Sequence, residues 1–141
     1  MAVFTQTYNV DASDFSRAGE ASGAVKKTLK SLGFAPDIIR RFSIAMYEAE
    51  INMVIHANGG TITVSISPEE LCAVVADVGP GIPDVGLAMQ EGWSTASEKV
   101  RGMGFGAGMG LPNIKKYTDF LDIETTVGVG TTVTMKVFVK K

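Results

Sequence analysis

The chain is poor in the features that mark secreted, membrane-spanning and nucleic-acid-binding proteins. It has a single cysteine, Cys72, so no disulfide and no cysteine-based metal site can form within one chain. No stretch approaches the roughly 18 consecutive apolar residues of a transmembrane helix, and no basic segment followed by an apolar one opens the sequence. No basic face or long basic run stands out, and the formal net charge is −2. We therefore expect a cytoplasmic protein that binds neither membranes nor nucleic acid.

Glycine, by contrast, is abundant and unevenly distributed. Nine of the 16 glycines lie between Gly79 and Gly110. Glycine adopts positive φ angles freely and lets the backbone approach a ligand closely, so this clustering is the first indication of a binding loop. Cys72 lies in the mostly apolar run 71–76, which favours a buried structural thiol.

The pattern of apolar residues predicts one α+β domain over residues 1–141. Strands follow one another directly, so the sheet must be mixed but mostly antiparallel, with helices packed on one face in a two-layer sandwich. Asp11 or Ser13 can cap the first helix, which runs to about Leu32 and stops at Gly33. The other expected elements are strands at 2–9, 61–67, 71–77, 119–125 and 130–139, helices at 36–57 and 109–118, and a possible short helix near 84–91.

The second predicted helix carries polar residues at a helical spacing. Glu48 and Asn52 are four residues apart, so they lie above one another at one border of an apolar stripe. Glu50 points toward the opposite border. A carboxylate at Glu48 could accept a proton, and the amide oxygen of Asn52 suits Mg²⁺. The alternative is a solvated helix edge with ordinary polar residues. The stripe comprises Ile38, Phe42, Ala45, Met46, Ala49 and Met53.

Asp77 ends an otherwise apolar strand and is followed by Gly79 and Gly81. A carboxylate is costly to bury without a hydrogen-bond donor, and a purine amino group is one such donor. The glycines would let the chain turn sharply and lie close to a flat base. The alternative is a plain turn in which aspartate is the turn former.

A run of alternate glycines, 102–110, leads directly into the third predicted helix. Free backbone N–H groups and the positive helix end would make an anion site that suits phosphates, with Lys99 and Arg101 nearby. No Gly-Lys-Ser/Thr follows the glycines, so this is not a Walker A loop, and no βαβ unit surrounds it. The alternative is a flexible surface loop.

Taken together and in this order, these elements resemble the GHKL ATPase superfamily over nearly the whole chain. Glu48-x-x-x-Asn52 resembles its N box, Asp77-x-Gly79-x-Gly81-Ile82 its G1 box, and Gly106-Ala107-Gly108-Met109-Gly110-Leu111 its G2 box. Thr131, at the start of the last strand, resembles the final ATP-contacting threonine. The resemblance implies the Bergerat fold, ATP with Mg²⁺, and a mobile lid over about 84–107. It also implies Glu48 as general base, Asn52 on Mg²⁺ and Asp77 on the adenine amino group, with Thr95, Lys99 and Arg101 as further candidate contacts.

A free-standing domain of this size resembles the anti-sigma-factor serine kinases and the related switch kinases, most closely the RsbT type. The stretches 77–84, 91–95 and 108–116 are the most similar to that type, whereas 96–105 is longer than expected. The resemblance implies phosphorylation of a serine or threonine on a STAS-domain antagonist protein. Further implied partners are a sigma factor, a phosphatase of the PP2C type and a second copy of the chain in a homodimer.

Two other functions stay open. The protein could bind ATP and capture a sigma factor or activate a phosphatase stoichiometrically, with little or no phosphotransfer. It could also be an ATPase fragment of a larger machine.

Overall fold

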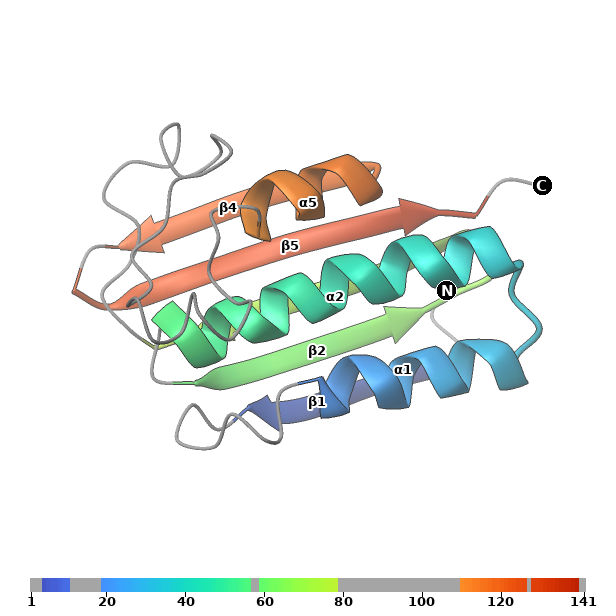
Figure 1. Ribbon diagram of the computed structural model, residues 1–141, viewed down its shortest axis with the longest axis horizontal. Helices are drawn as coiled ribbons and strands as arrows, with labels where there is room; N and C mark the ends of the chain where they lie inside the picture. The colour runs from blue at the N-terminus through green and yellow to red at the C-terminus, as the bar shows by residue number, and fades with distance from the viewer. Residues whose placement is uncertain (1–3, 11–18, 57–58, 79–109, 127, 140–141) are drawn as a thin grey trace, which may run out of the picture.

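The computed structural model describes residues 4–10, 19–56, 59–78, 110–126 and 128–139 (Figure 1). Its elements in chain order are β1 (Phe4–Val10), α1 (Glu20–Ser31), α2 (Pro36–His56), β2 (Gly60–Ile66), β3 (Glu70–Asp77), α5 (Gly110–Tyr117), β4 (Phe120–Thr126) and β5 (Gly130–Phe138). These bounds match the predicted ones to within one or two residues, except at the start of α1. The possible helix near 84–91 and the expected lid lie outside the described residues.

Within the described residues, five strands form one sheet in the order β1-β2-β3-β5-β4, and every pairing between them is antiparallel. Helices α1, α2 and α5 lie together over one face of this sheet, with α2 between the other two (Figure 1). The predicted α+β two-layer sandwich is therefore confirmed.

The hydrophobic core lies between the sheet and the helices. The apolar stripe predicted for α2 is buried along its whole length. On β3, Leu71, Ala73 and Val75 face the helices, as their alternation predicts. Cys72 points to the opposite face of the sheet and is only half-buried, so the expectation of a buried thiol is wrong. Among the described residues, no helix is both long and apolar enough to cross a membrane.

Helix α1 begins later than its predicted caps, Asp11 and Ser13. Gly19, the residue before the helix, takes a left-handed conformation with φ of 97° and has no side chain that could cap it. The predicted end is confirmed: Ser31 is the last helical residue, and Gly33 has a φ of 82°.

The cap of α1 comes instead from the neighbouring helix α2. The carboxylate of Glu50, 2% exposed, accepts hydrogen bonds from the backbone N–H groups of Gly19, Ala21 and Ser22 at 3.0, 3.2 and 3.0 Å. These N–H groups belong to the helix start, where no intrahelical acceptor exists, and the positive end of the helix dipole favours a negative charge there. A buried carboxylate thereby satisfies the first turn of α1 and fixes α1 against α2.

We expect Glu50→Ala to lower the free energy of unfolding by about 3–5 kcal/mol, because it leaves buried N–H donors without an acceptor. Glu50→Gln should cost less, since the amide oxygen can still accept hydrogen bonds. Urea unfolding measures both, and Glu124→Ala, at an exposed position of β4, is the control. A loss in Glu50→Ala no larger than in Glu124→Ala would contradict this role.

Candidate functional site

Asp77 and Thr131, both predicted to contact a nucleotide, lie next to each other in the sheet. The backbone N–H of Thr131 donates a hydrogen bond of 2.8 Å to Oδ1 of Asp77. Thr131 is buried, and its hydroxyl lies 3.0 Å from that of Thr125 on β4. A Cβ at position 130 would clash with the backbone carbonyl of Asp77, so glycine there permits the close approach of β3 and β5.

The hydrogen bond from Thr131 offsets only part of the effect of burial on the Asp77 carboxyl. Burial raises its pKa above the usual value of 3.8, and the hydrogen bond from Thr131 opposes that rise. No hydrogen bond to Oδ2 is found among the described residues. Oδ2 can therefore accept a hydrogen bond from a ligand, and an amino group is a suitable donor.

Glu48 lies on α2 and faces α5, on the side of α2 away from Glu50. Nδ2 of Asn113 is 3.5 Å from Oε1 of Glu48. Burial raises the pKa of Glu48 above 4.5, whereas the hydrogen bond from Asn113 lowers it. A carboxylate whose pKa is raised in this way holds a proton more readily than free glutamate does, which suits a proton acceptor.

Asn52 lies one turn after Glu48 on α2 and is half-buried. Within the part of the chain that the structure describes, no three His, Cys, Asp or Glu side chains gather into a group that could hold a metal ion. A single amide oxygen without such a group does not suit a metal held by protein ligands alone. It does suit Mg²⁺, which keeps several waters and shares its coordination with a bound phosphate.

These residues gather at one end of the sandwich. Figure 1 shows the end of α2 and the start of β5 at the same end of the sheet, with the start of α5 directed toward that end, and the strand register places the end of β3 beside the start of β5. In the sheet register, Asp77 pairs with Gly60, and a Cβ at Gly60 would meet the side chain of Met53, on the last turns of α2. Topology therefore brings the predicted N-box, the start of the predicted G1 box and the threonine to one place.

Two of the remaining predicted contacts lie in α5, and the others fall outside the described residues. Gly110 and Leu111 form the first turn of α5, which puts the end of the predicted G2 box at a helix N-terminus. The other predicted residues lie outside the described residues, namely Gly79, Gly81, Ile82, Thr95, Lys99, Arg101, Gly106, Ala107, Gly108 and Met109.

The sequence did not predict that Asn113 contacts Glu48 or that Glu50 caps the N-terminus of α1. Asn113 is 65 residues from Glu48 in the chain, so only the packing of α5 beside α2 reveals the contact. Its position one turn into a helix that follows a glycine-rich loop was the only available signal.

We expect the pKa of Glu48, measured by carbon-detected NMR titration, to lie above 4.5. Asn113→Leu should raise it further, because the hydrogen bond to the ionised form is lost while the site stays covered. Asn9→Leu, on the edge strand β1, should leave the Glu48 value as in wild type. A Glu48 pKa that does not rise in Asn113→Leu would show that the amide does not stabilise the carboxylate.

Comparison with known proteins agrees with this geometry. Residues 12–137 match the family described as the histidine kinase-like ATPase domain. The serine/threonine-protein kinase RsbT of Bacillus subtilis strain 168 is 30% identical over 110 residues, which are 75% of this chain and 77% of that protein. An anti-sigma F factor of Thermoanaerobacter sp. strain X514 is 36% identical over 100 residues, 67% of this chain and 66% of that protein.

A solved structure supports the fold independently. The histidine kinase domain of the blue-light activated histidine kinase from Erythrobacter litoralis superimposes with a TM-score of 0.50 at 16% identity. The match covers 86% of this chain and 61% of the other, and at this identity it bears on the fold alone. With the family match over residues 12–137, the GHKL resemblance is confirmed, and the chain belongs to the histidine kinase-like ATPase domain family.

Proposed function

We propose that the protein is an ATP-dependent serine/threonine kinase that phosphorylates a STAS-domain antagonist protein in bacterial partner-switching control of a sigma factor. The observation that carries the proposal is the half-buried Glu48, with a raised pKa, at the end of the sandwich that also holds Asp77 and Thr131. The similarity to a protein named serine/threonine-protein kinase RsbT supports the reaction class.

ATP fits the residues at this end of the sheet. Oδ2 of Asp77 is available to accept a hydrogen bond from the adenine amino group, while the Thr131 N–H holds Oδ1 in place. The N-terminus of α5 directs backbone N–H groups toward the end of the preceding glycine-rich segment, where phosphates would be stabilised. Mg²⁺ held through Asn52 would neutralise phosphate charge when bound.

The reaction requires a hydroxyl group near Glu48. The hydroxyl oxygen of the partner's serine or threonine attacks the γ-phosphorus of ATP, the bond to the β–γ bridging oxygen breaks, and ADP leaves. The hydroxyl proton passes to the Glu48 carboxylate, whose raised pKa favours its uptake. Catalysis of this kind depends mainly on positioning and electrostatic stabilisation. A phosphate placed in the contact with the partner would then weaken the complex through its charge.

A second function follows from the relatives named anti-sigma F factor. In that case the protein binds ATP and captures a sigma factor, or activates a phosphatase of the PP2C type, and phosphotransfer is secondary. The cytoplasmic location and the homodimer expected from the sequence are compatible with both functions and stay predictions.

The test is incubation of the protein with γ-labelled ATP and a STAS protein encoded beside its gene. Wild type should transfer label to the STAS protein, and Glu48→Gln should reduce the rate by about 10²-fold or more, since it removes the proton acceptor but keeps the shape. The control is Glu69→Gln, an exposed glutamate in the turn between β2 and β3.

No label transfer by wild type, or full transfer by Glu48→Gln, would contradict the kinase. Co-purification of a sigma factor that survives Glu48→Gln, without label transfer by wild type, would establish the second function instead.

A further inference from the structure

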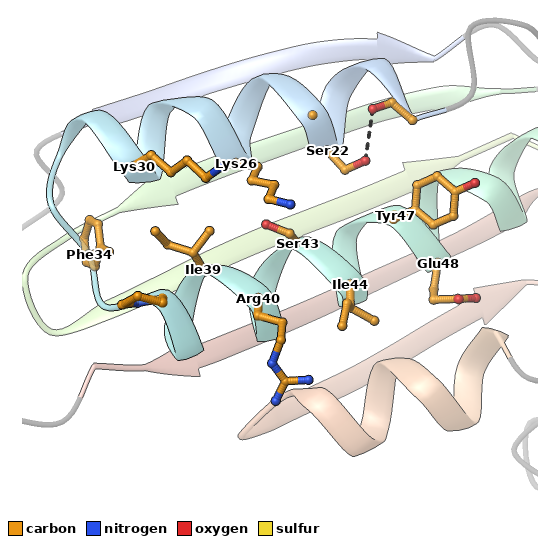
Figure 2. A pocket seen from close by; sticks show the side chains of 13 residues that line it. Ser22, Lys26, Lys30, Phe34, Ile39, Arg40, Ser43, Ile44, Tyr47 and Glu48 are labelled. Carbon is orange, nitrogen blue, oxygen red and sulfur yellow. Dashed lines mark hydrogen bonds between the residues drawn. The ribbon is translucent and has the colours of Figure 1, made fainter.

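A groove of about 870 Å³ runs between α1 and α2 on the side of the helices that faces away from the sheet (Figure 2). Its walls are one face of each helix, with lining residues spaced three and four apart, such as Lys26 and Lys30 on α1 and Ile39, Ser43 and Tyr47 on α2. The α2 wall extends from Pro36 to Glu48, about 18 Å at 1.5 Å per residue. We call this feature the α1–α2 groove.

The floor of the groove is apolar and includes an unsatisfied polar group. Phe34, Ile39 and Ile44 supply apolar surface to it. The buried hydroxyl of Ser43 has no hydrogen-bond partner within the described part of the chain, and Figure 2 shows it between the two helices. A buried hydroxyl normally has a partner, so a group that enters the groove could supply it.

Gly23 lies on the α1 wall of the groove, and the fold itself does not require a glycine there. It is the fourth residue of α1 and has a helical conformation, for which glycine is less favourable than alanine. A Cβ added at Gly23 would have no heavy atom within 4 Å, so no close packing inside the described chain excludes a side chain. The missing side chain leaves the groove wider at its middle, which indicates room for an occupant.

The charges of the groove are separated along its length. Lys26 and Lys30 lie on the α1 wall, whereas Figure 2 shows Arg40 and Glu48 on the side of α2 that faces α5. Among the described residues, neither lysine has an ion pair, but Arg40 has one with Asp37 at 3.3 Å and lies 5.7 Å from the centroid of the Tyr117 ring on α5. The two lysines therefore offer positive charge to an acidic partner, and Glu48 is the last α2 residue of the lining.

We propose that the α1–α2 groove docks an acidic, amphipathic helix of the protein substrate. The apolar face of that helix packs onto Phe34, Ile39 and Ile44, and its acidic side chains pair with Lys26 and Lys30. Glu48 is the last α2 residue of the groove lining, so the docked helix brings the partner alongside α2 near this carboxylate. The identity of the partner as the phosphoacceptor rests on the proposed function, but the binding of an acidic helix does not.

The first test is binding of a fluorescent amphipathic peptide of about 16 residues, with leucines at i, i+3, i+4 and i+7 and glutamates elsewhere, to the full chain. A peptide with lysine in place of each glutamate is its control. Fluorescence anisotropy should show binding of the acidic peptide only. The double variant Lys26→Glu/Lys30→Glu should weaken the affinity for the acidic peptide by about tenfold or more, because it reverses the charge of the groove. Gly23→Leu should weaken the affinity by a similar factor, because its side chain fills the groove. Lys27→Glu, on an exposed position of α1 that does not line the groove, should change affinity less than about twofold.

Equal binding of both peptides, or acidic-peptide affinity that survives both groove variants, would overturn the proposal. Binding of anionic lipid vesicles in preference to the acidic peptide, or a dimer that only the groove variants dissociate, would assign the groove to a membrane or a second copy and would also overturn it. Circular dichroism confirms that each variant is folded.

The second test separates docking from phosphotransfer. With the STAS substrate, Lys26→Glu/Lys30→Glu should raise KM for the acceptor by about tenfold, while Lys27→Glu should leave it as in wild type. An unchanged KM with intact label transfer would overturn the docking groove and leave the kinase standing. If wild type transferred no label but still bound the acidic peptide, the kinase would be contradicted and the docking groove would stand.

Discussion

The hydrogen bonds of one buried carboxylate, Glu50, hold the helical layer together. Glu50 belongs to α2 and takes the place of a local N-cap for α1. If α1 separated from α2, the Glu50 carboxylate and the first N–H groups of α1 would lose these hydrogen bonds. The position of α1 fixes the α1–α2 groove, and α2 carries the proposed catalytic residue. The groove and the site at the end of the sheet therefore depend on the same contact.

Helix α2 separates two tasks by helical geometry alone. Glu48 and Glu50 are two residues apart, about 200° around the helix, so they face opposite neighbours. Glu50 faces the N-terminus of α1, and both of its carboxylate oxygens accept backbone hydrogen bonds there. Within the described part of the chain, the Glu48 side chain has one hydrogen bond, from Asn113 at 3.5 Å, and burial raises its pKa, so it is available for proton transfer. The apolar stripe between them anchors both to the sheet.

Much of this arrangement could be predicted from local patterns. Alternation located the strands, Gly33 marked the end of α1, and the spacing of Glu48 and Asn52 placed them at one border of the buried stripe of α2. The start of α1 could not be predicted, because Asp11 and Ser13 are good caps locally, whereas the actual acceptor is 28 to 31 residues away. The burial of Cys72 was predicted wrongly because a mostly apolar strand does not show which of its faces packs against the helices. The contacts of Asn113 and of the Thr131 N–H likewise depend on packing between distant segments.

We propose that Asp77, Thr131, Glu48 and Asn113 line one nucleotide site at the end of the sheet. Titration of the ¹⁵N-labelled protein with Mg²⁺ and a non-hydrolysable ATP analogue, followed by amide NMR shifts, tests this site. We expect saturable shifts at Thr131, Val78 and Asn113, with little change at Lys30 and Glu69, which lie at the other end of the sandwich. Shifts confined to that other end, or no saturable shift at Thr131, would contradict it.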